Sequence, residues 1–194
     1  IHASTQVNSS SYETIKLLYE MGVKRVVLPR EMSVDEIKKI DIPIEIEVFI
    51  HGALCVSYSG NCLFSSMLGG RSGNRGECVG SCRLPYKLYK DKTLIDEGYL
   101  LSMKELNTSL DIKKLPSNVT SLKIEGRMKS PSYVGFVTKY YRKILDNEKL
   151  STKDLEDLKS MFYRGFTKGH LFNDEDLINK KSPNHLGSYL GKVI

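Results

Sequence analysis

The first fifty residues alternate between short apolar runs and segments in which apolar residues recur at helical spacing. The apolar runs are Ile1–Thr5, Arg25–Pro29 and Ile44–Ile50. Two S-x-x-E patterns, Ser10 to Glu13 and Ser33 to Glu36, precede the helical segments and are typical of capped helix starts. This strand–helix rhythm predicts parallel βα units, with helices covering a parallel sheet.

Further strands are expected beyond the first fifty residues. Ser121–Glu125 has the pattern of a short strand beside the first three. Tyr86–Asp91 and Thr93–Asp96 predict a polar hairpin that turns around Lys92, and Tyr99–Leu101 predicts another strand. Together with the βα rhythm, these segments predict an α/β fold, specifically an incomplete parallel βα barrel.

Helices are expected in three places in the second half. Ser102 and Glu105 form another S-x-x-E pattern, which predicts a helix near Met103–Leu110. Ser130 and Pro131 predict a helix start, and the aromatic stripe that follows is interpreted as core rather than as an RNA-stacking surface. A last helix is predicted from Ser151 to Met161, followed by loop and linker through Pro183.

All four cysteines lie within a segment rich in Gly and Ser. Six residues separate Cys55 from Cys62, fifteen separate Cys62 from Cys78, and three separate Cys78 from Cys82. Flexible backbone of this kind can bring distant thiols together. The uneven spacing favours an iron–sulfur centre. Structural zinc, two disulfides and unligated thiols remain the alternatives.

The formal net charge of +6 is concentrated in the middle of the chain. Residues 71–92 carry six basic and two acidic groups, and residues 123–143 carry six basic and one acidic group. Such a surface is typical of proteins that bind an anionic partner, with RNA as the leading candidate and a solvated basic face as the alternative. The expected RNA-binding residues are Arg71, Arg75, Arg83, Lys123 and Lys129. The three arginines are also expected to favour thiolate over thiol.

Several polar residues follow directly after predicted strands, where the ends of parallel strands converge. They are Gln6, Arg30, Glu31, His51, Lys123, Glu125 and Arg127. From these we take His51, Glu125 and Arg127 as candidate catalytic residues, with Glu125 as a general base held between the cations Lys123 and Arg127. The alternatives are a paired surface carboxylate for Glu125 and a structural hydrogen-bonding role for His51. The chain contains no nucleophile elbow, no H-E-x-x-H zinc pair, no phosphate loop and no dinucleotide-binding fingerprint.

Two segments, EVFIHGALCVSYSGNC and GGRSGNRGECVGSCR, resemble the signature of the collagenase-like peptidase family U32. The segments HASTQVN, GVKRVVLPRE and SLKIEGRMKSPSYV resemble further blocks of this family in the family's order. The resemblance implies that residues 1–149 are the second half of a TIM-like barrel with a cysteine-rich loop at 51–85. Residues 150–185 would then be a helical extension and linker, and 186–194 the start of a C-terminal β domain.

The resemblance also implies a function. Some family members are labelled collagenases, and others hydroxylate a wobble uridine of tRNA, a cytidine of ribosomal RNA or a ubiquinone precursor. The quinone relatives bind a 4Fe–4S cluster through four cysteines, and by matching position Cys55, Cys62 and Cys78 resemble three of these ligands. The place of the fourth ligand varies within the family, and Cys82 matches the tRNA-type branch and at least one quinone-type member.

The sequence therefore favours iron–sulfur-dependent hydroxylation of an RNA base, of the tRNA wobble uridine type. A collagenase-like peptidase and a non-catalytic cluster-binding scaffold are the alternatives. Hydroxylation is preferred because the chain offers clustered thiols and basic surface but no activated nucleophile; the best peptidase version pairs Cys55 with His51.

The sequence also bears on partners and on location. We expect RNA, most of all tRNA, as the partner, together with a partner chain or second copy that completes the barrel. No apolar run reaches the roughly 20 residues that a membrane helix needs, so we expect a cytoplasmic protein without a membrane partner. Because the chain begins with Ile1, we expect a further N-terminal part.

Overall fold

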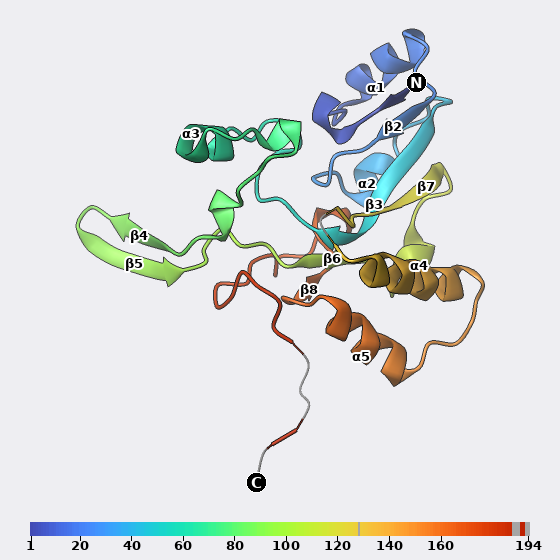
Figure 1. Ribbon diagram of the computed structural model, residues 1–194. Coiled ribbons are helices and arrows are strands. Elements are labelled where there is room, and N and C mark those ends of the chain that lie inside the picture. Colours follow the sequence, from blue (N-terminus) through green and yellow to red (C-terminus); the bar gives the residue numbers. More distant parts are fainter. Residues whose placement is uncertain (128, 188–190, 193–194) are drawn as a thin grey trace.

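The computed structural model describes residues 1–127, 129–187 and 191–192. Its centre is a six-stranded mixed sheet (Figure 1). Four of its strands are mutually parallel, as the sequence predicts: β1 (His2–Ala3), β2 (Arg25–Val27), β3 (Glu45–Ala53) and β7 (Val119–Ile124). The α/β class with a largely parallel sheet is confirmed. The sheet does not close within the part of the chain that the structure describes, so the predicted partial barrel remains unconfirmed.

Two helices connect the first three strands. Helix α1 (Tyr12–Glu20) is capped by Ser11, whose side chain accepts from the Thr14 amide, so the cap lies one residue after the predicted Ser10. Helix α2 (Val34–Ile37) has the predicted capping box, in which the side chains of Ser33 and Glu36 each accept from the other's backbone amide. These caps satisfy amides that the first helical turn leaves without partners.

The predicted helix at Met103–Leu110 is wrong. This segment contains strand β6 (Glu105–Asn107), which pairs antiparallel with His51–Ala53 of β3 and parallel with β8 (Phe166–Thr167). Within β3, strand β2 pairs with Glu45–Glu47 and leaves the far end of β3 uncovered on that side. Strand β6 supplies hydrogen-bond partners there. Burial of Met103 and Leu106 against Val27, Phe49 and Leu54 outweighs a capping pattern that no helical spacing of apolar residues supports.

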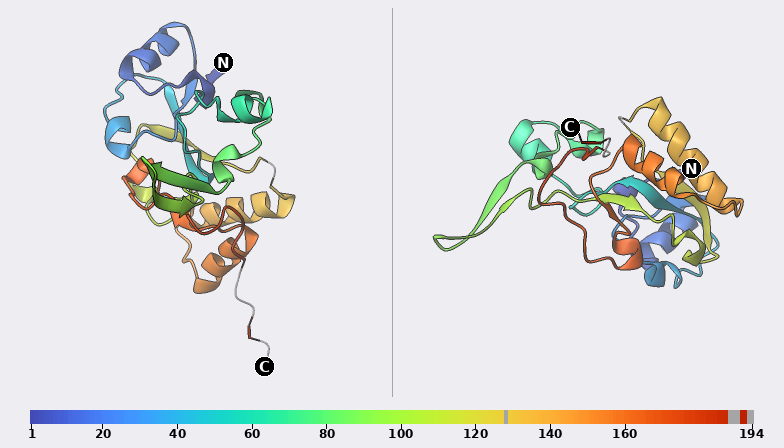
Figure 2. Two further views of the ribbon diagram at one scale, coloured as in Figure 1. Left: turned by 90° about the vertical axis from the view of Figure 1, so that its left-hand side faces the viewer. Right: turned by 90° about the horizontal axis from the view of Figure 1, so that it is seen from below.

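The predicted hairpin is confirmed as β4 (Tyr86–Lys90) and β5 (Thr93–Gly98), which pair antiparallel. It extends away from the central sheet in both Figure 1 and Figure 2. Asp91 lies at the turn with a φ of 54°. Tyr99–Leu101, predicted as a strand, instead forms a turn that leads into β6.

The aromatic stripe after Ser130 packs into the core, as predicted. Helix α4 (Pro131–Leu145) begins at the Ser130 cap and buries Tyr133, Val137, Tyr140, Tyr141 and Ile144 against the sheet residues of the main core. Helix α5 (Thr152–Met161) begins with a Ser151–Asp154 capping box and buries Leu158 in the same core. None of the helices that the structure describes combines the length and apolarity needed to cross a membrane.

The segment after α5 forms a strand and backbone hydrogen bonds that its polar sequence does not predict. The predicted loop at Tyr163–Phe172 contains β8. The predicted linker lies against β6, since the Lys104 amide donates to the Leu177 carbonyl at 2.8 Å and the Asn179 amide donates to the Ser102 carbonyl at 2.8 Å. Of the predicted final strand 186–194, residues 188–190 and 193–194 lie outside the described residues, and the others are not in a strand.

Candidate metal centre and its surroundings

The cysteine segment leaves the sheet at Leu54, directly after β3, and ends at Arg83, just before the β4–β5 hairpin. It contains helix α3 (Phe64–Gly69) and two short 3-10 turns, Gly73–Arg75 and Ser81–Arg83. In Figure 1 it lies beside the carboxyl ends of the parallel strands, between them and the β4–β5 hairpin. This is the edge at which parallel βα folds place ligands.

Polar side chains at the strand ends hold the start of this segment. Glu31, after β2, accepts from both the amide and the hydroxyl of Ser59, at 3.0 and 3.1 Å. Gln6, after β1, donates to the Asn74 carbonyl at 2.5 Å, and the Asn74 side chain donates to the Gly60 carbonyl at 2.7 Å. A Cβ at Gly60 would lie 2.6 Å from the Gln6 carbonyl oxygen, so this close approach requires glycine.

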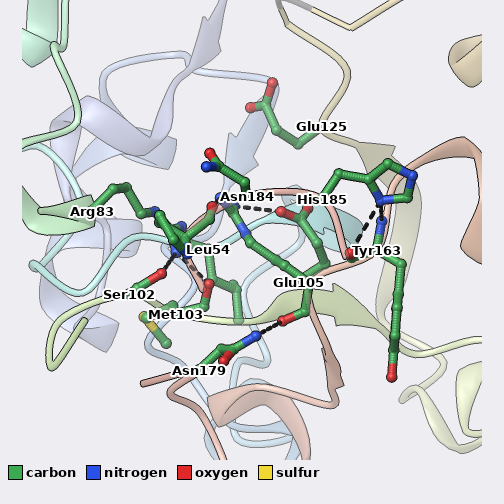
Figure 3. A network of polar contacts seen from close by, with 12 residues as sticks. Leu54, Arg83, Ser102, Met103, Glu105, Glu125, Tyr163, Asn179, Asn184 and His185 are labelled. Atoms are coloured by element: carbon green, nitrogen blue, oxygen red, sulfur yellow. Dashed lines mark hydrogen bonds and ion pairs between the residues drawn. The ribbon is translucent and has the colours of Figure 1, made fainter. Parts of the chain in front are cut away.

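Arg83 holds the end of the segment. Its guanidinium donates to the Leu54 carbonyl at 2.9 Å, to the Ser102 hydroxyl at 2.9 Å and to the Met103 carbonyl. Figure 3 shows the side chain pointing into this group. Arg83, a candidate RNA-binding residue, therefore has its donors engaged inside the protein.

All four cysteines line one cavity of about 380 Å³. Each is a free thiol, and the Gly80 amide donates to the Cys78 sulfur at 3.4 Å. The described residues contain no group of three or more His, Cys, Asp or Glu side chains close enough to hold one metal ion. A 4Fe–4S cluster, in contrast, bonds each of four thiolates to a different iron, so its ligands stand further apart. The all-sulfur donor set, the amide donor and the cavity fit such a cluster.

Burial has the largest effect on the pKa of two of these thiols, Cys55 and Cys82. It raises the pKa of Cys55, against an opposing hydrogen bond from the Ser57 backbone and the charge of Arg30. Burial also raises the pKa of Cys82, against the opposing charge of Arg83. Of the three arginines predicted to favour thiolate, Arg83 acts in that direction on Cys82. On Cys55 the arginine with this effect is Arg30, and burial has the larger effect on the pKa of both thiols.

His51 lies in the core. His51 belongs to β3 and is 1% exposed, and its Nδ1 lies 3.3 Å from the Tyr141 hydroxyl oxygen. Burial, with a smaller contribution from the charge of Lys129, lowers its pKa to about 4. His51 lines neither the cysteine cavity nor a second cavity that adjoins it beside Glu31. This placement favours a structural role over the predicted catalytic one.

Glu125 meets a different cation from those predicted. Its carboxylate lies 3.2 Å from the Arg30 guanidinium and accepts from the Arg127 amide at 2.8 Å. Lys123 instead pairs with Glu47 at 3.1 Å. A Cβ at Gly52, whose φ is 109°, would lie 2.5 Å from the Glu125 carbonyl oxygen, so β3 and the end of β7 approach closely only because residue 52 is glycine.

Three of the five candidate RNA-binding residues are engaged within the protein. Besides Arg83 and Lys123, Lys129 has its ammonium 2.8 Å above the Phe162 ring centroid, and burial lowers its pKa. Arg71 and Arg75 are exposed on the cysteine segment. The guanidinium of Arg127 lies against Gly76, where a Cβ would be 2.2 Å from its nitrogens.

With this geometry in place, comparison with known proteins identifies the family. The chain matches the model described as peptidase family U32 over residues 1–181. The chain belongs to peptidase family U32.

Relatives in this U32 family carry two kinds of name. A 23S rRNA 5-hydroxycytidine synthase of Escherichia coli is 45% identical over 151 residues, covering 75% of this chain and 23% of the relative. A tRNA hydroxylation protein P of Helicobacter pylori is 36% identical, covering 88% and 45%. A collagenase of Porphyromonas gingivalis is 35% identical, covering 88% and 47%.

These U32 relatives are longer than the chain, which spans between 23% and 50% of those that it matches. No solved structure matches it.

One buried ion pair of this U32 chain was missed from sequence. Glu105, 1% exposed in β6, pairs with the Arg164 guanidinium just before β8. Figure 3 includes Glu105 in this network, in which the Asn179 side chain donates to the Arg164 carbonyl at 2.8 Å. Glu105 and Arg164 are far apart in sequence and neither directly follows a predicted strand, so no local sequence pattern predicts their pairing.

Proposed function

We propose that this chain carries the centre of an iron–sulfur-dependent RNA base hydroxylase, with Cys55, Cys62, Cys78 and Cys82 as the ligands of a 4Fe–4S cluster. The observation that carries the proposal is the single cavity lined by all four cysteines at the carboxyl edge of the parallel strands. The names of the relatives support RNA as the substrate class. A tRNA wobble uridine is the proposed target, and a cytoplasmic location belongs to the same proposal.

The residues around the cavity have defined tasks in this proposal. Replacing a base C–H bond by C–OH is a two-electron oxidation, so the proposal requires an external oxygen-atom donor that supplies the oxygen and is itself reduced by two electrons. A cluster bound by the four cysteines would supply electron transfer at the cavity that they line. Arg30 and Arg83 place positive charge next to Cys55 and Cys82 and would offset the negative charge of four thiolates. The Gly80 amide would donate to a Cys78 thiolate.

The peptidase alternative finds little support in the geometry. It needs an activated nucleophile, but burial raises the pKa of Cys55. His51, the nearest candidate base in sequence, has its Nδ1 beside the Tyr141 hydroxyl inside the core. The non-catalytic scaffold and the hydroxylase predict different outcomes when RNA oxidation by the cluster-loaded protein is measured.

The test is anaerobic reconstitution with iron and sulfide, followed by visible absorbance and metal analysis of the wild type and of Cys78→Ala. We expect the variant to lose iron and sulfide together. Ser57→Ala, which changes another cavity-lining residue, is the matched control and should bind iron as the wild type does.

Two further measurements separate the alternatives. Mass spectrometry of tRNA incubated with the reconstituted protein should show a gain of one oxygen on a base. Full metal content in Cys78→Ala would contradict the four-cysteine centre. A loaded cluster without RNA oxidation in a cell lysate would favour the scaffold, and cleavage of gelatin that requires Cys55 would favour the peptidase.

A further inference from the structure

A second cavity, of about 370 Å³, adjoins the cysteine cavity. The two share one wall, made by Cys55, Val56 and Ser57. The rest of the second cavity comes from the connection between β1 and α1, from the connection between β2 and α2, from Glu36 in α2, and from Tyr58 and His170. A group bound in it would therefore be separated from a centre on the cysteines by a single stretch of backbone.

The carboxylate of Glu31 is the distinctive group in this cavity. Its Oε1 is fixed by the Ser59 amide and hydroxyl. Its Oε2 is buried and accepts no hydrogen bond from any residue that the structure describes. A buried acceptor without a donor is unfavourable. Oε2 is covered by protein atoms, so it gains a donor when the Glu31 side chain turns toward the cavity and meets a ligand N–H group there.

The other walls suit a planar ring. Tyr58 is 69% exposed at the rim, and an aromatic side chain in this position offers a face for stacking an unpaired base. Met32 provides a buried apolar surface. Glu31 and Glu36 give the cavity negative charge, which disfavours phosphate inside it and leaves the backbone of a bound nucleic acid outside.

We propose that this cavity receives the pyrimidine base of the RNA substrate, flipped out of its stack. On binding, the Glu31 side chain turns its Oε2 toward the cavity and accepts from the N–H donor on the Watson–Crick edge, which is the ring imide of uracil or the exocyclic amine of cytosine. Tyr58 covers the ring face. This inference rests on the proposed hydroxylase function, because it gives the substrate of that same centre its place.

The test measures binding of free uridine and cytidine by saturation-transfer NMR, using the wild type, Glu31→Gln and Tyr58→Ala. We expect transfer to the base protons in the wild type and at least about tenfold weaker binding in each variant, since one loses an ionic acceptor and the other a stacking face. Tyr58 is largely exposed, so Tyr58→Ala should fold normally even if Glu31→Gln loosens the Ser59 contact. Glu156→Gln, on the exposed side of α5, is the matched control and should bind as the wild type does.

The result that overturns the inference is wild-type protein without transfer to either nucleoside, or variants that bind both as tightly as the control. RNA oxidation is measured separately. Nucleoside binding that depends on Glu31, without any RNA oxidation, refutes the proposed reaction and retains the cavity. RNA oxidation with unchanged KM in both variants retains the reaction and refutes the cavity.

Discussion

Arg83 donates a hydrogen bond of 2.9 Å to the carbonyl of Leu54, 29 positions earlier in the chain. This contact joins the two ends of the cysteine segment, because Leu54 precedes Cys55 and Arg83 follows Cys82. The same guanidinium donates to the Ser102 hydroxyl and the Met103 carbonyl, so one side chain ties the segment to the residues that lead into β6.

Arg83→Ala should therefore destabilise the protein. Each buried carbonyl left without a donor costs about 1–3 kcal/mol, and we expect a loss in that range from urea unfolding, together with weaker iron incorporation. Arg71→Ala is the control, because Arg71 is exposed and should change stability by at most about 0.5 kcal/mol. Equal effects of the two substitutions would contradict the structural role of Arg83.

Gly52→Ala should be among the more damaging small substitutions. The new Cβ would lie 2.5 Å from the Glu125 carbonyl oxygen at a φ of 109°, and backbone strain of this kind costs about 1–3 kcal/mol. Gly135→Ala is the opposite case, because a Cβ there meets nothing within 4 Å on α4. It should stabilise the protein by up to about 1 kcal/mol. Thermal unfolding of both variants checks the pair, and a stabilised Gly52→Ala would show that β3 and β7 do not approach as described.

His51 should make stability depend on pH. Burial lowers its pKa from 6.5 to about 4, so below its ordinary value the unfolded chain binds a proton that the folded protein excludes. The stabilisation is complete above pH 6.5 and is lost as the pH falls toward 4, amounting to up to about 3 kcal/mol.

The His51 prediction is checked by urea unfolding across this pH range. His51→Phe should show a smaller loss of stability than the wild type, since it removes the titrating group and keeps a ring among Tyr133, Tyr141 and Phe166. His2→Gln, at an exposed position, should follow the wild-type curve. Parallel curves for wild type and His51→Phe would show that His51 titrates normally.

Arg71 and Arg75 should carry RNA affinity, because they are the two candidate cations that remain exposed on the cysteine segment. The double variant Arg71→Glu, Arg75→Glu should bind tRNA more weakly and with a shallower salt dependence. Each lost phosphate contact reduces the slope of log affinity against log salt by about 0.7–0.9. Lys149→Glu, Lys153→Glu, at exposed positions near and in α5, is the charge-matched control. Identical slopes for the two double variants would contradict this placement of RNA.

The sequence predicted what local pattern and chain order determine. The parallel strands β1, β2, β3 and β7, the hairpin and the Ser130 cap follow from apolar periodicity and capping residues, and the four cysteines were expected at one site. Strand β6 could not be predicted, since its pairing depends on how little of β3 is covered by β2. The partners of Glu125 and His51 were also missed, because Arg30 and Tyr141 reach them from distant parts of the chain.

The cysteine segment is attached to the sheet through side-chain hydrogen bonds from Gln6, Glu31 and Arg83 rather than through strand pairing. Its opening free energy should therefore be smaller than that of global unfolding. We expect amides of residues 55–82 to exchange hydrogen faster than those of β3 and to slow on iron–sulfur loading. A segment that opens while the sheet stays folded would let iron and sulfide enter a finished scaffold, so that maturation of the centre becomes a late event, independent of the folding of the chain.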